Sequence, residues 1–279
     1  MQKILFGLLI FGFNYCAAST VTINQNANTF LVTAATGAFG ECICNSIAEK
    51  GYDLIITGRN QKKLDELQKR LKSQHPLVSV QSLIIDFSDT LTIHLAAKKL
   101  ERKSISGIVL IGPRPVLTKD GIPTKEEWSQ VFLETFINPL EVISAFSPFI
   151  KENASIIVIS GNSSKNYLPG YPNTNVIRLA WSGEIKNLAH YFGKRKIRVN
   201  AISPGPILTQ FHIDRIKEKA FSNNISFEEQ AAKNASSIPL GAYGKPDDVA
   251  NLVLFLLSSK SAHLNGINIV LDGGESLAY

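Results

Sequence analysis

Hydrophobic residues along this chain gather in short runs that alternate with longer stretches of mixed polarity. The short runs are rich in Val, Ile and Leu, and they predict buried strands at 29–33, 53–57, 78–85, 107–111, 155–159, 198–202 and 267–271. Between them, apolar residues recur at helical spacing and predict helices at 41–50, 60–74, 91–102, 125–151, 176–192 and 247–258, with 125–151 forming one long or one broken helix. A polar segment, 206–237, precedes the last helix.

The regular alternation of strands and helices predicts the fold class. Strands joined by helices of this length pair in parallel through right-handed crossovers. The expected fold is therefore α/β, a Rossmann-type doubly wound parallel sheet flanked by helices, formed as a single domain. A chain of 279 residues with 44% hydrophobic and 19% charged residues suits one such domain, which we assign to residues 20–279.

Residues 1–19 differ from the rest of the chain. They combine one charged residue, Lys3, with an apolar stretch at 4–13 and small residues at 17–19. This layout predicts a secretory signal peptide cleaved at its small-residue end, and hence a periplasmic or secreted protein. The alternative is an uncleaved N-terminal extension on a cytoplasmic protein. The apolar stretch is too short to cross a bilayer, so no transmembrane span is expected.

Charge and cysteine content narrow the function classes. The formal net charge is +6 and the isoelectric point about 9.1, but Lys and Arg are spread along predicted helices without interleaved aromatic residues. That distribution is typical of solvated helix faces, so we expect no nucleic-acid partner. Cys42 and Cys44 are two apart on a predicted helix and point in different directions, which predicts free thiols and no metal site.

The segment after the first strand has the composition of a ligand-binding turn. It runs T-A-A-T-G-A-F-G from Thr33 to Gly40, between a strand and a helix. In such a unit the free N–H groups of the helix and its dipole face an anion such as a phosphate. Because ligands of a doubly wound sheet lie beyond the carboxyl ends of its strands, this turn shares one rim with Asp86, Gly112 and 204–209.

Several motifs follow one another along the chain in a characteristic order. They are Val32 to Gly40, 57–60 (T-G-R-N), Asp86 after the third strand, 197–205 (I-R-V-N-A-I-S-P-G) continuing to Thr209, and 271–274 (L-D-G-G). Together they resemble the short-chain dehydrogenase/reductase superfamily, and the likeness runs from residue 29 to residue 274. The resemblance implies an oxidoreductase acting on a carbonyl or alcohol, with a small-molecule substrate enclosed by a lid at about 206–237. It also implies a homodimer or homotetramer.

The resemblance implies a cofactor site as well. The residues that match the superfamily's pyrophosphate turn are Thr33, Gly37, Phe39 and Gly40, with Ala34 and Ala38 in place of its first and second glycines. The methyl group of Ala38 weakens the approach to the phosphates if that position needs a positive φ. Arg59 stands where NADP-preferring members carry a basic residue, and Gly58 replaces the acidic residue that would bond an unphosphorylated ribose. The expected cofactor is NADP(H) rather than NAD(H).

Other cofactor contacts follow from the same resemblance. Asp86 is expected to bond the adenine amino group, and Ile207 and Thr209 are expected to meet the nicotinamide carboxamide. Gly112, after the fourth strand, is expected to lie against the cofactor, and Arg178 is expected to hold the nicotinamide ribose.

The residues that handle the proton in the superfamily are not matched. The superfamily uses a Tyr acid, a Lys four residues later, a Ser that holds the carbonyl oxygen, and an Asn in a proton relay. Gap-free counting puts Thr174 at the Tyr position, Arg178 at the Lys position, Gly161 at the Ser position and Thr135 at the Asn position, with Asn138 one helical turn further on. The run from Thr174 to Arg178 resembles a divergent branch in which Ser/Thr-Asn-x-x-Arg replaces Tyr and Lys.

Thr174 and Arg178 are therefore the candidate catalytic residues, with changed roles. A Thr hydroxyl is far too weak an acid to replace a tyrosine but can orient a carbonyl, while Arg178 stays charged and can stabilise an oxyanion. Tyr167 and Tyr171 are the local candidates for a substitute acid, the alternative being that they only pack over the site. Two functions stay open: an NADP(H)-dependent oxidoreductase with a degenerate catalytic tetrad, and a non-catalytic dinucleotide-binding or scaffold protein.

Overall fold

The strands form one parallel sheet. A computed structural model describes residues 28–100, 104–115 and 121–278, and within them the sheet has seven strands in the order β3-β2-β1-β4-β5-β6-β7, every neighbouring pair parallel. The strands are β1 (Thr29–Val32), β2 (Asp53–Gly58), β3 (Val80–Ile84), β4 (Ile105–Ile111), β5 (Ile150–Ile159), β6 (Arg198–Pro204) and β7 (Asn268–Leu271). The predicted doubly wound fold is confirmed, and the strand order reverses between β1 and β4.

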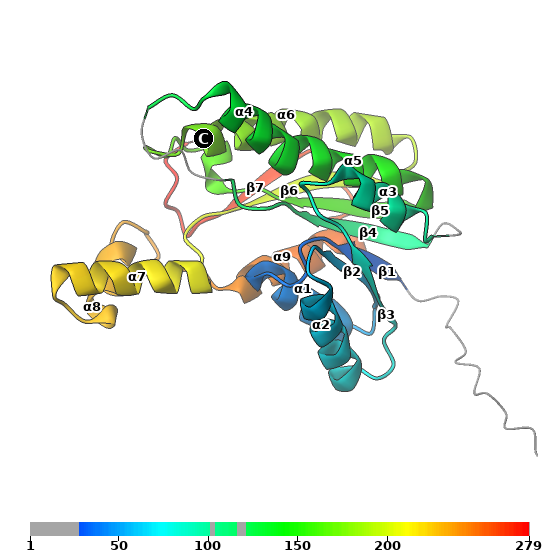
Figure 1. The fold of residues 1–279 in the computed structure, drawn as a ribbon, viewed down its shortest axis with the longest axis horizontal. Coiled ribbons are helices and arrows are strands. Elements are labelled where there is room, and N and C mark those ends of the chain that lie inside the picture. Colours follow the sequence, from blue (N-terminus) through cyan, green and yellow to red (C-terminus); the bar gives the residue numbers. More distant parts are fainter. Residues whose placement is uncertain (1–27, 101–103, 116–120, 279) are drawn as a thin grey trace, which may run out of the picture.

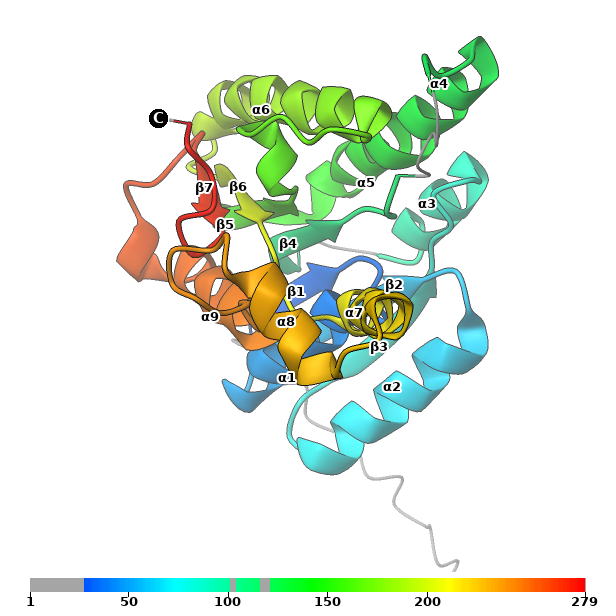
Figure 2. The ribbon, with the colours of Figure 1, turned by 90° about the vertical axis from the view of Figure 1, so that its left-hand side faces the viewer.

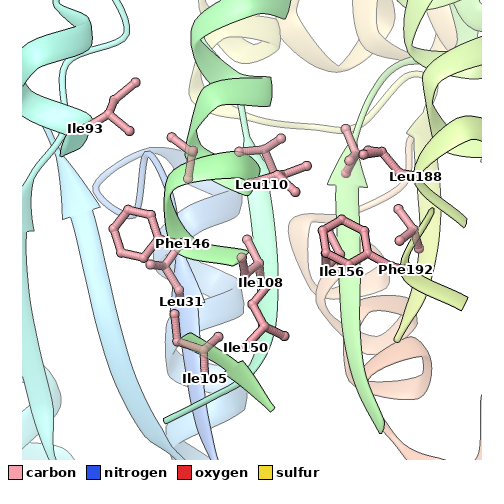
Figure 3. Close-up of a cluster of buried hydrophobic side chains, with 14 of the residues drawn as sticks. Leu31, Ile93, Ile105, Ile108, Leu110, Phe146, Ile150, Ile156, Leu188 and Phe192 are labelled. Atoms are coloured by element: carbon pink, nitrogen blue, oxygen red, sulfur yellow. The ribbon is translucent and has the colours of Figure 1, made fainter. Parts of the chain in front are cut away.

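Helices cover both faces of the sheet (Figure 1). One face carries α1 (Ala38–Glu49), α2 (Gln61–Gln74) and α9 (Pro246–Leu257), and the other carries α3 (Thr90–Ala97), α4 (Lys125–Phe132), α5 (Asn138–Phe146) and α6 (Pro172–Gly193). Because both faces are buried, successive strand residues enter different cores. Leu31 packs on the α5 and α6 side, and Val32 packs on the α1 and α9 side. Figure 3 shows the first core, where Phe146 and Phe192 are among the largest fully buried side chains.

Two helices, α3 and α6, have one end four or more residues away from its predicted position. α3 was predicted to reach residue 102 but ends at Ala97, because the chain tightens into turns in which Lys99 and Leu100 donate to carbonyl groups three residues back. Residues 101–103 lie outside the described part of the chain. α6 begins at Pro172, one turn before the predicted start at 176. Proline is favoured in the first turn of a helix, where its missing N–H would have no partner.

The predicted helix at 125–151 is broken. α4 passes into a π-helical turn (Leu133–Ile137) before α5 begins, and a 3-10 turn (Ser147–Phe149) follows α5. The wide turn ends just ahead of Pro139, which has no N–H for the helical hydrogen-bond ladder. β5 then begins at Ile150 rather than at the predicted 155. The start was missed because polar residues at 151–153 follow Ile150 and interrupt the apolar run.

The polar segment at 206–237 contains two helices that the sequence pattern did not indicate. α7 (Gln210–Asn223) and α8 (Phe227–Ala235) project from one end of the sheet (Figure 1), and α7 is seen end-on from that side (Figure 2). The segment follows directly on the carboxyl end of β6. α7 and α8 therefore stand at the rim where ligands of a doubly wound sheet bind.

The signal peptide predicted at 1–19 falls outside the described residues and stays a prediction. Among the helices that the structure describes, none is long and apolar enough to cross a membrane. Cys42 and Cys44 are free thiols in the described part of the chain, as predicted. Burial, together with the nearby Asp247 carboxylate, raises the pKa of Cys42 to about 11, so this thiol is protonated at neutral pH.

Candidate active site

Thr33 holds the turn after β1 in place. Its hydroxyl donates to the carbonyl oxygen of Ile111 at 2.9 Å and accepts from the N–H of the same residue at 2.7 Å. The side chain is fully buried, so it ties the end of β1 to the end of β4 and does not face a ligand. The structure thus gives Thr33 a role in shaping the turn, and its part in binding a cofactor stays a prediction.

Gly40 and Ala34 set the backbone of the same turn. A Cβ on Gly40 would lie 2.6 Å from the Cα of Ala35, so α1 can pack this closely on the turn only with glycine there. Ala34 has a φ of 45°, in the left-handed region that favours glycine. The positive φ considered for Ala38 thus falls at Ala34, and Ala38 is an ordinary first residue of α1.

The N-terminus of α1 is accessible to a ligand. Gly37 and Ala38 are exposed, and Phe39 is half-buried. No side chain of the described residues caps this helix, so solvent or a ligand must satisfy the N–H groups of its first turn. Free N–H groups at the positive end of the helix dipole fit the phosphates of a dinucleotide.

Arg59 and Asp86 lie beyond the ends of β2 and β3. The Oδ1 of Asp86 accepts hydrogen bonds from the N–H of Ser88 at 3.0 Å and from its hydroxyl at 2.8 Å. The N–H bond, and after it the hydroxyl bond and the nearby Arg59 cation, hold the pKa of Asp86 below its usual range despite partial burial. Asp86 is therefore an ionised acceptor, and the exposed Arg59 side chain brings a positive charge beside it.

A cavity of about 280 Å³ lies at the carboxyl ends of β4, β5 and β6. Its described lining comes from the start of α1, the loops after these strands, the start of α6 and the first turn of α7. The sequence-predicted residues that line it are Phe39, Gly112, Gly161, Tyr171, Thr174, Arg178 and Thr209. The structure therefore brings both candidate catalytic residues into one chamber, while Arg59 and Asp86 lie further along the rim.

Arg178 and Gly161 face each other in this cavity. The Nη1 of Arg178 donates to the carbonyl oxygen of Ile159 at 3.4 Å, and a Cβ on Gly161 would lie 3.3 Å from the Nε of Arg178. Glycine at 161 thus leaves room for the guanidinium group. Burial, and secondly the nearby Arg114 cation, lower the pKa of Arg178 to about 10, so the side chain still carries its charge at neutral pH.

Thr174 lies one helical turn before Arg178 on α6. Its Oγ1 is buried and has no hydrogen-bond partner among the described residues, and the same holds for the Oγ of Ser160, which also lines the cavity. A buried hydroxyl group without a partner is unfavourable unless water or a ligand supplies one. Thr174 and Ser160 are therefore lining residues whose hydrogen-bonding capacity is not used within the described part of the chain.

Thr135 and Asn138 have polar atoms committed elsewhere. The hydroxyl of Thr135, inside the π-helical turn, donates back to the carbonyl oxygen of Val131. Asn138 donates to the carbonyl oxygen of Phe87 at 2.7 Å and accepts from the hydroxyl of Thr90 at 2.8 Å. The expectation that both occupy one helical face assumed a regular helix, and the wide turn at Thr135 breaks that register.

Ile207 and Thr209, expected at the nicotinamide, differ in exposure to the cavity. The side chain of Ile207 is buried in the core on the α1 and α9 side, so only its backbone is available to a ligand. Thr209 lines the cavity, and its hydroxyl lies 3.1 Å from the Nδ1 of His212. Burial, and then the cations of Arg114 and Arg215, lower the pKa of His212 and favour the neutral ring at neutral pH.

The two tyrosines considered as substitute acids are separated by the structure. Tyr171 lines the cavity, and its hydroxyl accepts a hydrogen bond from the Nη1 of Arg215 at 3.1 Å. Tyr167 is 75% exposed and is not among the described residues of the cavity wall. Tyr171 is therefore the better placed of the two to meet a substrate.

Two arginines near the cavity were not singled out from the sequence. The guanidinium carbon of Arg114 lies 3.5 Å from the ring centre of Phe211 on α7, and that of Arg215 lies 5.6 Å from it. Arg114 lies between prolines at 113 and 115, which restrict its backbone conformation. These prolines are the sequence signal that could have drawn attention to this loop. Arg215 follows Phe211 by four residues, which places both on one face of α7.

The sequence model of the family described as Enoyl-(Acyl carrier protein) reductase matches residues 34–276. The chain belongs to this family of the short-chain dehydrogenase/reductase superfamily. Among curated members, NADPH-dependent reductase BacG of Bacillus subtilis is 26% identical over 255 residues, covering 90% of this chain and 98% of that protein. The 3-oxoacyl-[acyl-carrier-protein] reductase FabG of Rickettsia felis is 28% identical over 260 residues, with the same coverage of the two chains.

Solved structures of short-chain dehydrogenases/reductases share the fold. An NADPH-bound short-chain oxidoreductase from Pseudomonas aeruginosa PAO1, described as containing an atypical catalytic center, has a TM-score of 0.81 and 23% identity, and the match covers 90% of this chain and 98% of that one. YwfH, an NADPH-dependent reductase involved in bacilysin biosynthesis, has a TM-score of 0.82 and 22% identity, with 91% and 100% covered. At these identities the likeness is one of fold.

Proposed function

We propose that this short-chain dehydrogenase/reductase binds NADP(H) along the rim of its sheet. The open N-terminus of α1 suits the pyrophosphate, and Arg59 suits a 2′-phosphate because a guanidinium group offers several N–H donors to phosphate oxygens. Asp86, ionised beside it, suits the adenine amino group. Relatives that are named as NADPH-dependent or were solved with NADPH support the choice of this cofactor.

We further propose that the chain reduces a carbonyl group or oxidises the matching alcohol in the cavity beside Arg178. NADPH bound there supplies the hydride. The observation that carries the proposal is the buried, unpartnered hydroxyl of Thr174 one turn from the charged Arg178 in the same cavity. Thr174 orients the carbonyl oxygen as a hydrogen-bond donor, and Arg178 stabilises the negative charge that develops on that oxygen. The segment 206–237 acts as the lid, contributing Thr209 and His212.

The proton-handling set is degenerate in this proposal. Thr135, Gly161, Thr174 and Arg178 take the positions of the superfamily's Asn, Ser, Tyr and Lys. The committed hydroxyl of Thr135 and the missing side chain at Gly161 agree with a lost proton relay. Without a positioned acid, we expect turnover to fall by about 10²- to 10⁴-fold relative to an intact set. Tyr171, which lines the same cavity, is the candidate substitute acid.

The decisive experiment is NADPH oxidation over a panel of ketones, aldehydes and quinones, with the wild type beside the triple variant Gly161→Ser/Thr174→Tyr/Arg178→Lys. Arg178 is replaced together with Gly161, because a Cβ at 161 would lie 3.3 Å from its Nε, closer than most Cβ contacts, and would require the guanidinium group to shift. We expect a slow wild type and a gain in the triple variant. The matched control is Gly161→Ser/Arg178→Lys, which has no new phenol and should show no gain.

Wild-type turnover near the ordinary enzyme median of about 10 s⁻¹ would contradict the degenerate set, and Tyr171→Phe would then test the substitute acid. The second candidate function is a non-catalytic dinucleotide-binding or scaffold protein. The weak acidity of the Thr174 hydroxyl favours it. Binding of NADPH without any wild-type turnover, together with a gain in the triple variant, would support this second function.

A further inference from the structure

Two neighbouring hollows beneath the lid are lined by cationic side chains. The cavity beside Thr174 contains Arg114 and Arg178, and a second hollow of about 220 Å³ contains Arg215 and Lys219. The two hollows share Tyr171 and His212 in their walls. Neither has an Asp or Glu among its described lining residues. A concave wall that carries charge of one sign concentrates ligands of the opposite sign.

Among the described residues, the arginines of these hollows have no acidic partner. Across the described ranges, no carboxylate oxygen lies within 4.0 Å of a side-chain nitrogen of Arg114, Arg178 or Arg215. Arg178 is held by a backbone carbonyl oxygen and Arg215 by a phenol, and neither of these groups neutralises a charge. Arg178 is half-buried, while the side chains of Arg114 and Arg215 are exposed at the hollows, so a bound anion can reach both guanidinium groups.

Two glutamates approach Arg114 but are engaged elsewhere. Glu127 and Glu134 line a third, smaller hollow together with Arg114. Glu127 accepts the N–H of Thr124 at 2.7 Å and so caps α4, and Glu134 accepts from the Nε2 of Gln130 at 3.1 Å. Neither carboxylate has an oxygen within 4.0 Å of a side-chain nitrogen of Arg114, so neither forms an ion pair with it.

Aromatic contacts hold the arginines without using up their charge. Arg114 stacks on the ring of Phe211 at 3.5 Å, and Arg215, whose Nη1 donates to the hydroxyl of Tyr171, lies on the same ring at a greater distance. A guanidinium group that stacks by its flat face keeps N–H donors along its edge. The loop after β4 and helix α7 thus each place in the wall of one hollow a guanidinium group that has no carboxylate partner among the described residues.

We infer that the substrate carries an anionic group, a carboxylate or a phosphate monoester, which Arg114 and Arg215 bind beneath α7. The inference rests on the proposed reductase function, because it assigns the reacting carbonyl to Thr174 and Arg178 in the adjoining cavity. Guanidinium groups recognise both oxyanions through paired N–H donors. The phosphates of the cofactor are already accounted for by the N-terminus of α1 and Arg59, which lie on other elements of the rim.

Calorimetric titration of the full chain, with and without saturating NADP⁺, tests this inference with matched pairs of probes. Levulinate is compared with methyl levulinate, and dihydroxyacetone phosphate with dihydroxyacetone. At least one anionic probe should bind about tenfold or more tightly than its neutral partner, as for hydrogen bonds to charged groups. The pair with the larger preference separates a carboxylate from a phosphate. Equal binding within both pairs would overturn the inference.

Arg114→Gln and Arg215→Gln identify the binding groups. Each should abolish most of the preference for the anionic probe while leaving the affinity for NADPH unchanged. Lys217→Gln is the matched control, because it removes one charge from the same helix at an exposed position outside both described walls. A preference that survives both arginine variants, or a loss of NADPH affinity in either, would refute the assignment. NADPH titration of the wild type separately tests the proposed cofactor function, so the two failures are distinguishable.

Discussion

The two ends of the ligand rim differ in what carries their chemistry. At the turn after β1, the groups that suit a phosphate are backbone N–H groups, positioned by the close approach of Gly40 and the buried Thr33. In the cavity of α6, the available chemistry belongs to side chains, chiefly Thr174 and Arg178. A site built from backbone tolerates exchanged side chains as long as the path of the chain is kept. A site built from side chains can change its reaction with each substitution.

The largest effect should come from Gly40→Ala, which attacks the backbone site directly. The new Cβ would lie 2.6 Å from the Cα of Ala35, so either the turn or α1 must shift. We expect a loss of about 1–3 kcal/mol in the free energy of unfolding, measured by urea denaturation, and a large loss of NADPH affinity in calorimetry.

The control for that variant is Gly183→Ala on α6. A Cβ there meets no atom within 4 Å among the described residues, so alanine should stabilise the helix by about 0.5–1 kcal/mol without affecting NADPH binding. Unchanged stability and cofactor affinity in Gly40→Ala would show that the turn can shift to accept a Cβ at low cost. The claim that the phosphate site depends on the path of the backbone at this turn would then be contradicted.

The next effect concerns Arg59, the side chain that we assign to the cofactor's 2′-phosphate. Arg59→Ala should weaken NADPH binding by about ten- to a hundredfold, the usual range for a hydrogen-bonded charge, and leave NADH binding nearly unchanged. Calorimetric titration with both cofactors measures the change. Lys62→Ala, at an exposed position on α2, removes a neighbouring charge and serves as control. Equal affinity of the wild type for NADPH and NADH would remove the proposed role of Arg59.

The fold was largely predictable because strands and helices each have a local pattern of apolar residues in the sequence. Strand–helix alternation was enough to predict the parallel sheet, and six helical regions were located from apolar spacing. The misses have local causes of another kind. The π-helical turn at 133–137 has no sequence pattern of its own, and α7 and α8 bury few residues, so their apolar stripes are faint. The start of β5 was missed because polar residues at 151–153 interrupt its apolar run.

The candidate site was predictable where it lies on continuous elements. Counting back from β6 along α6 selected Thr174 and Arg178 as site residues, and in the structure both line one cavity. Counting works here because α6 is one continuous helix. Counting also reached Thr135, but the direction of its hydroxyl depends on the wide helical turn and could not be foreseen. Arg114 and Arg215 both lie near the ring of Phe211, although one belongs to a loop and the other to a helix far along the chain. Only the three-dimensional structure reveals this arrangement.

The smallest effect should come from Ala34→Gly, which asks whether the alanine at a left-handed position harms the turn. The φ of 45° at Ala34 costs an L-residue about 1–2 kcal/mol, while glycine loses about 0.5–1 kcal/mol more backbone entropy on folding. The difference predicts a net stabilisation of about 0.5–1 kcal/mol in urea denaturation. Lys196→Gly, at an exposed residue with a φ of 56°, should stabilise by a similar amount and serves as control.

Because the turn already has its working conformation, NADPH affinity should change by less than about threefold in Ala34→Gly, a free-energy difference well below 1.4 kcal/mol. A tenfold gain in affinity with Ala34→Gly alone would mean that the methyl group obstructs the phosphates, and the backbone end of the rim would then be as sensitive to side chains as the catalytic end.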